Sequence, residues 1–343
     1  MMKFKAFILC LSTLVMAYMT SCNSKLEPIR RTGNASITFY VNELTRASVS
    51  PGDGVVADGG GIYSSAGNPD VVILITETSN PYKVIAKYIN PSDADVIECT
   101  STQVTIQFTE IPVGEYVVYA VANTGGLWPI SGFSSWSSLK KASDIDPLEF
   151  TALSANVSPA LRNGMLPLSA KGTLVVEESG QGVVTMQMTR CVGKIVVDLV
   201  NQTGADLTMT DFDMILHNVN PDRGYVFPHS PDVPDATTYG NYLLSKSSIT
   251  ILNGQTYSDS TLVFPGVTSA PSREYTCDVS FTSFAVSNSY SNLPVITSRA
   301  EPILKIDRDE RLHIVIRIAK GQTVSFNFEV GEWTKKTQYV VFY

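Results

Sequence analysis

The sequence predicts an all-β protein with two β-sandwich domains in tandem after a lipoprotein signal peptide. Three observations lead to this prediction. Most apolar segments after residue 35 are short, and they either alternate with polar residues or are rich in β-branched residues, as strands are. Pro and Gly fill the gaps between them. The first 22 residues combine a basic start, an apolar run and a cysteine.

The signal sequence begins with basic residues and continues with the apolar run 6–19, which has the length of a signal-peptide core and is too short to cross a bilayer comfortably. Small residues then lead into Cys22, as in a bacterial lipobox, although Met19 stands where Leu is favoured. We expect a signal peptide over 1–21, lipidation of Cys22 by acyl chains such as palmitate, and a tether over 22–35. The alternative is an ordinary secretory signal with a chance cysteine.

The first strand is predicted at 36–44, where Ile37, Phe39 and Val41 form one apolar face. The pattern ends shortly before Arg46, which is followed by Ala, Ser, Pro and Gly residues. Two interpretations of Arg46 remain open: a solvated charge at the end of an edge strand, or a site of proteolytic cleavage.

The remaining pattern is also mainly that of strands, with a turn at 111–114, a hairpin signal at 179–182 and one candidate for a short helix at 134–153. A β-branched run that starts a new strand suggests a division into domains 36–189 and 190–343. Strands are expected at 70–77, 103–108, 116–122, 173–176, 183–188, 194–200, 209–217, 260–264, 276–284, 311–318, 324–330 and 338–343.

The residues that carry chemistry form no recognisable site. The net charge of −7 argues against nucleic acid as a partner. No histidine has the spacing of a zinc site, and no nucleophile motif is present, so we expect no catalytic residues, no metal and no cofactor. Three cysteines besides Cys10 and Cys22 are widely spaced, and buried thiols are favoured over a disulfide framework: Cys99, Cys191 and Cys277.

Four motifs, in order along the chain, resemble the fimbrillin family of Bacteroidales, the subunits of type V pili. They are Phe108-Thr-Glu-Ile-Pro-Val-Gly-Glu-Tyr116 with Val121-Ala-Asn123, Leu166-Pro-Leu-Ser169, Thr189-Arg-Cys-Val-Gly-Lys-Ile195, and Phe328-Glu-Val-Gly-Glu-Trp333. Leu168 and Gly193 depart from the usual Met and Ala. The resemblance implies two sandwiches of the transthyretin-like or Greek-key type.

The resemblance also implies a mechanism for the stretch around Arg46. Such subunits reach the surface as outer-membrane lipoproteins, and an arginine-specific protease cuts after the first strand, here between Arg46 and Ala47. Loss of the strand would leave an apolar groove for the strand of another pilus subunit. The candidate donor lies within 338–343 and comprises Tyr339, Val340, Val341, Phe342 and Tyr343. The alternative is that this segment completes its own sheet.

Three functions remain open at this stage. The first is a cleaved, polymerising fimbrial subunit at the cell surface that supports adhesion to a host or bacterial target. The second is an anchor subunit that keeps its lipid. The third is a monomeric surface lipoprotein that binds glycan or host protein through aromatic residues such as Trp128, Trp136, Tyr239 and Tyr242. A cut at Arg30 or Arg31 would release the lipid but leave the first strand in place.

Overall fold

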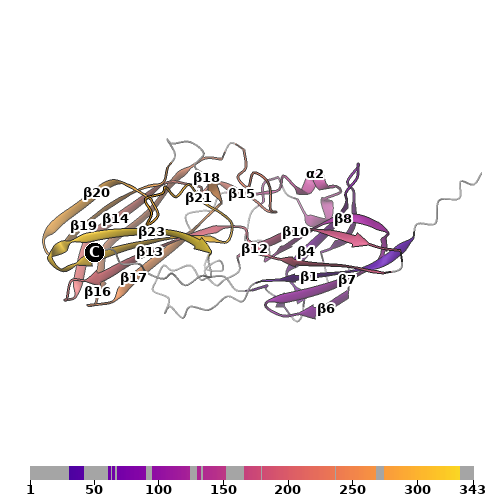
Figure 1. Cartoon of the computed structure of the whole chain (residues 1–343), viewed down its shortest axis with the longest axis horizontal. Coiled ribbons are helices and arrows are strands. Elements are labelled where there is room, and N and C mark those ends of the chain that lie inside the picture. Colours follow the sequence, from indigo (N-terminus) through magenta and orange to yellow (C-terminus); the bar gives the residue numbers. More distant parts are fainter. Residues whose placement is uncertain are drawn as a thin grey trace, which may run out of the picture.

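A computed structural model describes residues 31–41, 61–62, 64–65, 68–89, 95–123, 130–132, 134–151, 166–178, 180–235, 237–267 and 274–332. These residues form two β-sandwiches that lie end to end along the longest axis of the molecule (Figure 1). The expected all-β fold is therefore confirmed. Among the described residues, no helix has both the length and the apolar character needed to cross a membrane.

The N-terminal sandwich packs a sheet in the order β11-β1-β7-β6 against a sheet in the order β12-β10-β8-β4-β5. Its strands are β1 (Thr32–Tyr40), β4 (Val71–Glu77), β5 (Val84–Tyr88), β6 (Asp95–Cys99), β7 (Gln103–Pro112), β8 (Gly114–Ala122), β10 (Leu168–Val176), β11 (Gln181–Gln187) and β12 (Thr189–Arg190). A short pair, β2 (Ser64–Ser65) and β3 (Asn68–Pro69), precedes β4.

The C-terminal sandwich packs a sheet in the order β17-β13-β22-β23 against a sheet in the order β16-β14-β19-β20. Its strands are β13 (Gly193–Gln202), β14 (Leu207–Val219), β16 (Gly240–Ile251), β17 (Thr256–Val263), β19 (Thr276–Ser283), β20 (Val286–Pro294), β22 (Glu310–Ala319) and β23 (Val324–Glu332). A further short pair joins β18 (Gly266–Val267) to β21 (Lys305–Ile306).

The two sandwiches share one topology. In each, the first strand lies between an antiparallel and a parallel neighbour: β1 between β7 and β11, and β13 between β17 and β22. The opposite sheets correspond as well, because β10-β8-β4-β5 and β20-β19-β14-β16 are both wholly antiparallel. They differ at the sheet edges, where β6 is added to β7 in the first sandwich and β23 to β22 in the second.

A shared apolar cluster joins the two sandwiches. It contains Val72, Leu74, Tyr119 and Phe150 from the first, and Phe264 from the second. The strand β9 (Glu149–Thr151) also pairs with β15 (Arg223–Tyr225), so a small sheet bridges the junction. Burial on both faces explains why β4 has a continuous apolar sequence rather than an alternating one.

Several local predictions need correction. The turn signal at 179–182 does not form a hairpin: β10 and β11 lie in opposite sheets, and β11 pairs with β1 instead. The helix expected at 134–153 is reduced to a 3-10 turn, η1 (Trp136–Ser138), and one α-helical turn, α2 (Ala142–Ile145). A second 3-10 turn, η3 (Lys320–Gln322), joins β22 to β23.

The first strand begins and ends about four residues earlier than the predicted 36–44. Among the described strands of five or more residues, four lie outside the predicted ranges because their sequences are polar or short: β5, β6, β16 and β20. The segment 338–343 lies outside the described residues, and the division after residue 189 stays a prediction, since that position falls within β12.

Candidate functional site

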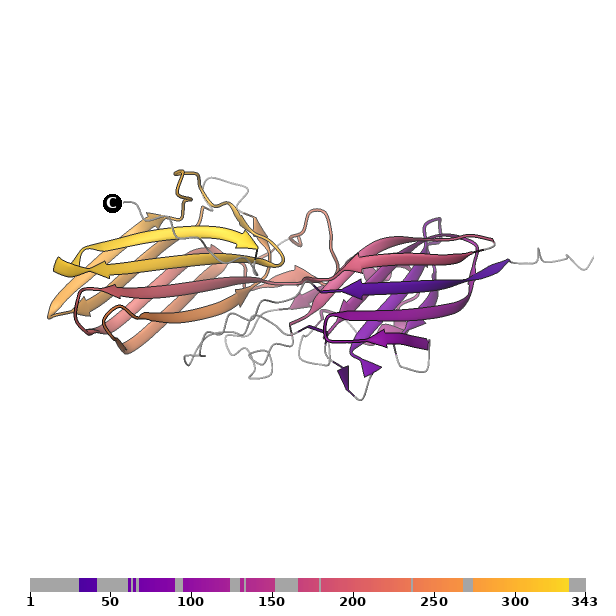
Figure 2. The ribbon, with the colours of Figure 1, turned by 60° about the horizontal axis from the view of Figure 1, so that its bottom comes forward.

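The first strand is an interior strand of its sheet, hydrogen-bonded on both sides. It runs parallel to β11 over Asn34–Tyr40 and antiparallel to β7 over Thr32–Tyr40. Two bonds continue the ladder at its end: Met188 donates its N–H to the carbonyl of Tyr40 (2.9 Å), and Val41 donates to the carbonyl of Thr102 (2.8 Å). Figure 2 shows β1, in indigo, between these two neighbours. Removing β1 would therefore expose one edge of each neighbouring strand.

The inward face of β1 fills the core of the N-terminal sandwich. The side chains of Ala35, Ile37 and Phe39 have no solvent exposure, and Val41 is 6% exposed. This alternation explains why the period-2 pattern could be recognised in the sequence.

Each large side chain of β1 has one partner on each neighbouring strand. Ile37 lies opposite Ile106 of β7 and Val184 of β11. Phe39 lies opposite Val104 of β7 and Met186 of β11. All four partners are buried and belong to the same core cluster. These pairs define two pockets, the Ile37 pocket and the Phe39 pocket.

The start of β1 is tightly packed. At the start, a Cβ added to Gly33 would lie 3.0 Å from Cγ1 of Val176 and 3.1 Å from the carbonyl oxygen of Gly180. Contacts this short force a neighbour to move, so any residue other than glycine is disfavoured there. Just before it, Arg31 forms an exposed ion pair with Glu178.

The burial of β1 is large on the scale of protein stability. Burying a Val, Ile or Phe side chain contributes about 1.5–3 kcal/mol, so Ile37, Phe39 and Val41 together contribute on the order of 5–9 kcal/mol. Small domains have a free energy of unfolding of about 5–15 kcal/mol. A sandwich that lost β1 would thus need another strand in its place.

The other predicted site residues lie outside the described part of the chain. These are Cys22, Arg46, Ala47 and the candidate donor residues Tyr339, Val340, Val341, Phe342 and Tyr343. The structure does show that β1 and the next described residue, Gly61, are joined only through the segment that contains Arg46.

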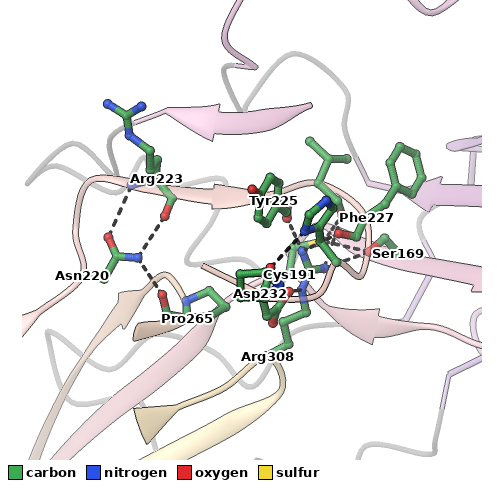
Figure 3. A network of polar contacts seen from close by, with 12 residues as sticks. Ser169, Cys191, Asn220, Arg223, Tyr225, Phe227, Asp232, Pro265 and Arg308 are labelled. Carbon is green, nitrogen blue, oxygen red and sulfur yellow. Dashed lines mark hydrogen bonds and ion pairs between the residues drawn. The ribbon is translucent and has the colours of Figure 1, made fainter. Parts of the chain in front are cut away.

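A second group of polar side chains fixes the junction between the sandwiches (Figure 3). Arg308 pairs with Asp232 (Nε to Oδ1, 2.9 Å) and donates to Ser169 Oγ of β10 (3.1 Å). Its guanidinium also donates to the backbone carbonyls of Tyr225, Val226 and Phe227. Since Ser169 belongs to the first sandwich and Arg308 to the second, this residue holds both together.

Two neighbouring residues add to this junction. Arg190 of β12 forms a buried ion pair with Asp309. Cys191 donates to Ser169 Oγ and to the carbonyl of Val226, each at 3.4 Å. Burial raises the pKa of the Cys191 thiol, which therefore acts as a structural group. Sequence reasoning missed Arg308; its only local signal was an arginine between two acids, Asp307 and Asp309, in a turn.

Two histidines pair with acids on neighbouring strands, and three cysteines in the described residues are unpaired. His313 pairs with Asp198 (2.7 Å) across β22 and β13, and His217 pairs with Asp278 (3.0 Å) across β14 and β19. Cys99, Cys191 and Cys277 are free thiols. Among the described residues, no group of three or more His, Cys, Asp or Glu side chains could hold a metal ion.

A surface hollow of about 430 Å³ lies beside the junction, lined by Asp146, Lys171, Pro228, His229 and Ser230. Its two charged groups already pair with each other, at 2.8 Å.

Of the aromatic residues considered for glycan binding, Trp136 packs edge-on against Phe227, and Tyr242 packs against the core of the C-terminal sandwich. Trp128 lies outside the described residues.

Comparison with known proteins identifies the family. A sequence model described as fimbrillin-A associated anchor proteins Mfa1 and Mfa2 matches residues 93–339. The chain belongs to this family. The predicted resemblance to fimbrillins is confirmed, and the chain is a fimbrial, cell-surface protein of a family of structural adhesion proteins rather than of enzymes. A search of curated sequences finds no significant match.

Solved structures share the fold of this fimbrillin relative over most of its length. A fimbrilin (FimA) from Porphyromonas gingivalis is 12% identical with a TM-score of 0.51, covering 89% of this chain and 99% of its own. The tip fimbrial protein Mfa3 from the same organism, with a C-terminal truncation, is 11% identical with a TM-score of 0.50, covering 88% and 100%. A protein from Parabacteroides distasonis with a suggested role in cell adhesion is 9% identical with a TM-score of 0.54, covering 90% and 99%.

Proposed function

We propose that the chain is a structural subunit of a surface fimbria that polymerises by exchange of its first strand. It is exported as a lipoprotein on Cys22, held at the outer membrane by its lipid, and cut between Arg46 and Ala47 by an arginine-specific protease. A strand from another fimbrial subunit then replaces β1, and the fibre supports adhesion. The observation that carries this proposal is the interior position of β1 between β7 and β11.

The position of the cut decides what is released. A cut after Arg46 separates β1 from the rest of the chain, and its hydrogen bonds and buried side chains then hold it without a covalent link. A cut after Arg30 or Arg31 would remove the lipid but keep β1 attached through residues 42–60. Only the cut after Arg46 opens a groove.

A head-to-tail exchange of this kind does not close on itself. Each subunit offers one acceptor groove and supplies one strand, so the contact is heterologous and builds a filament. Incoming backbone would restore the hydrogen bonds to β7 and β11, while its alternate side chains would refill the core.

A second candidate function is an anchor subunit that keeps its lipid. The description of the matched family, which names anchor proteins, favours this candidate. In an anchor, Arg46 would stay uncut and β1 would stay in place at the base of the fibre. A monomeric surface lipoprotein that binds glycan has less support, because Trp136 and Tyr242 pack against other side chains.

The test is the N-terminal sequence of the protein sheared from the cell surface, with a gel for ladders that survive mild detergent. The polymerising subunit starts at Ala47 and forms ladders, and Arg46→Ala abolishes both. The matched control, Arg30→Ala with Arg31→Ala, keeps both. Acylated Cys22 in a protein without ladders would support the anchor, and Cys22→Ala would then release it from the membrane.

A further inference from the structure

We infer that two copies of this chain pair side by side through the outer edge of β11, antiparallel and about a two-fold axis at Val184. Their two N-terminal sheets then form one continuous sheet. The inference goes beyond the proposed function and does not depend on it, because this edge lies on the side of β11 away from β1.

The strand β11 is an edge strand without the usual features that prevent edge pairing. Native edge strands commonly carry a charged residue, a proline or a bulge, which hinders the addition of another strand. The sequence of β11 is QGVVTMQ, and its pairing with β1 shows no register shift. Each of the other described edge strands of the two sandwiches has a charged residue or a proline; these are β5, β6, β12, β16, β17, β20 and β23.

The C-terminal sandwich shows that the corresponding edge accepts a strand. There β22 holds the place of β11, because each is the parallel neighbour of the first strand of its sandwich. The outer edge of β22 is covered by β23, which pairs antiparallel with it from Glu310 to Ile318. Among the described strands, β11 has no counterpart of β23. An antiparallel strand beside β11 would therefore make the two sheets alike.

Alternate residues of β11 direct their backbone groups away from β1. Met188, the residue after β11, donates its N–H to the carbonyl of Tyr40 on β1 (2.9 Å). In an extended strand the N–H and C=O of one residue point to the same side, and successive residues alternate. The even-numbered residues therefore face β1. The outer edge presents the N–H and C=O groups of Gln181, Val183, Thr185 and Gln187.

The order of these four residues is self-complementary. In an antiparallel pair centred on Val184, Gln181 of each copy lies opposite Gln187 of the other, and Val183 lies opposite Thr185. Every outward backbone group of β11 then has a partner. The side chains also match, since amide faces amide and two β-branched residues of similar shape face each other. Sliding one strand by two residues would leave one Gln of each copy opposite a residue outside β11. The sequence of β11 thus fits a second copy of itself.

The pairing should be weak between two isolated copies and strong between arrays of copies. A pair of seven-residue edges is a small interface. Copies held on one membrane, or repeated along a fibre, offer many such edges at a high effective concentration. Neighbouring copies on a membrane would then pair, and two fibres would align side by side.

Single cysteines at three neighbouring positions test the register. In the inferred pair the Cα atoms of the two Val184 residues are about 4.5 Å apart, which suits a disulfide. The two Val183 residues, and likewise the two Thr185 residues, lie diagonally at about 7–8 Å, beyond the usual range of about 4.4–6.8 Å. Val183 is 62% exposed and Val184 only 8%, so random collisions favour Val183→Cys, whereas the inferred pair favours Val184→Cys.

The variants are made in the full-length chain, in the cells that produce it, and intact cells are mildly oxidised. All carry Cys99→Ser, because Cys99 is partly exposed, and Arg46→Ala, which keeps β1 attached and so prevents polymers from contributing. This parent chain gives the background. We expect reductant-sensitive dimers from Val184→Cys at several times the background, and background levels from Val183→Cys and from Thr185→Cys.

A mixed experiment keeps the test valid if Val184→Cys disturbs the core. Copies with Val183→Cys and copies with Thr185→Cys, carrying different tags and produced together, should form dimers that contain both tags, because these positions face each other. Dimers from Val183→Cys alone or Thr185→Cys alone at the same level would show a shifted or random contact and overturn the inference. Background levels in every variant and in the mixture would overturn it too, since the edge then stays unpaired between copies.

A charge on the edge gives a second measurement. Val183→Lys should reduce the dimers of Val184→Cys to background, because it places an ammonium group on the edge, as natural edge strands do. The matched control is Val175→Lys, since Val175 is a similarly exposed valine (52%) on β10 of the opposite sheet, and it should leave the yield unchanged. Equal losses from both variants would show that the edge of β11 does not decide the contact, and would contradict the inference.

Discussion

The two sandwiches of this molecule place their first strands identically but attach them differently. β13 lies between β17 and β22 as β1 lies between β7 and β11. However, β13 follows β12 after two residues and leads into β14 after four, so it is tied covalently at both ends. β1 is followed by the long segment that contains Arg46. The same topology thus gives one permanent strand and one that a single cut can release.

The two strands also differ in their polar contacts. Asp198 of β13 accepts hydrogen bonds from Ser258 Oγ of β17 (2.6 Å) and from His313 Nε2 of β22 (2.7 Å), which links three strands through a charged group. On β1, Thr38 shares one neutral hydrogen bond with Thr105 of β7 (3.0 Å). β1 is held mainly by backbone pairing and apolar burial, interactions that any suitable strand can supply.

The sharpest way to test the comparison is to remove one large core side chain from each first strand. Phe39→Ala should destabilise the uncut precursor by about 3–5 kcal/mol, and Leu199→Ala by about 2–5 kcal/mol. In the fibre of the proposed function the two variants should differ. The Phe39→Ala fibre should dissociate like the unsubstituted one, because position 39 has left with β1. The Leu199→Ala fibre should be less stable, because position 199 remains in the C-terminal sandwich. Thermal unfolding of precursors and of fibres measures both. Fibres weakened by Phe39→Ala would show that β1 stays.

Weakening the junction should allow the two sandwiches to unfold independently. Arg308→Met should cost about 3–5 kcal/mol at neutral pH, because Asp232 is left largely buried without its partner. Calorimetry should then resolve two unfolding transitions instead of one. Arg223→Met is the control, since its side chain is 38% exposed and its ion pairs should contribute about 0–1 kcal/mol.

The effect of Arg308→Met should also depend on pH. Burial raises the pKa of Asp232 above its ordinary value, against the opposing charge of Arg308. Removing the charge of Arg308 raises the pKa of Asp232 further. A carboxyl whose pKa is raised in the folded state stabilises the fold as it becomes protonated. The loss of stability caused by Arg308→Met should therefore shrink as the pH falls from 7 towards about 4. A loss that stays constant with pH would contradict this account.

The charged contact of β13 should give a smaller effect that also shrinks in acid, but at a lower pH. Burial opposes ionisation of Asp198, but the hydrogen bonds from His313 and Ser258 outweigh it and hold the pKa of Asp198 below its ordinary value. The ionised Asp198 carboxylate therefore stabilises the folded protein at neutral pH, and this stabilisation is lost as the pH falls below about 4. Asp198→Asn should thus cost about 1.5–3 kcal/mol at pH 7 and less in acid.

The matched change on β1 should be the smallest. Thr38→Val should cost about 0.5–1.5 kcal/mol at every pH, because it removes one neutral hydrogen bond. Chemical denaturation of the precursor at several pH values compares it with Asp198→Asn. An equal cost and an equal pH dependence for the two would remove the distinction between the strands.

The sequence was informative where local pattern determines structure. Ile37, Phe39 and Val41 identified β1 because one face of the strand is buried and the other is not. β20 could not be found in this way, since its sequence VSNSYSNLP is mainly polar, as it can be in an edge strand whose one partner among the described strands is β19. β16 was missed because Ser and Lys residues interrupt its apolar positions.

Long-range pairing was beyond the reach of sequence patterns. The hairpin signal at 179–182 correctly marked a change of direction, but the partner of β11 is β1, about 147 residues earlier by the pairing of Asn34 with Gln181. The junction depends likewise on Arg308 meeting Ser169, 139 positions away. Neither contact leaves a local periodicity.

The mixed pairing of β1 has a mechanical consequence for the proposed fibre. Its hydrogen bonds to β7 and β11 lie across the strand direction, and so would those of a strand that replaces it. A pull along the fibre would load both ladders in shear, and the bonds on both sides would have to break almost together. If a new strand replaces β1 from one end, by contrast, the hydrogen bonds of β1 break only a few at a time. The joint could therefore assemble in small steps and still resist a pull along the fibre with all of its hydrogen bonds together.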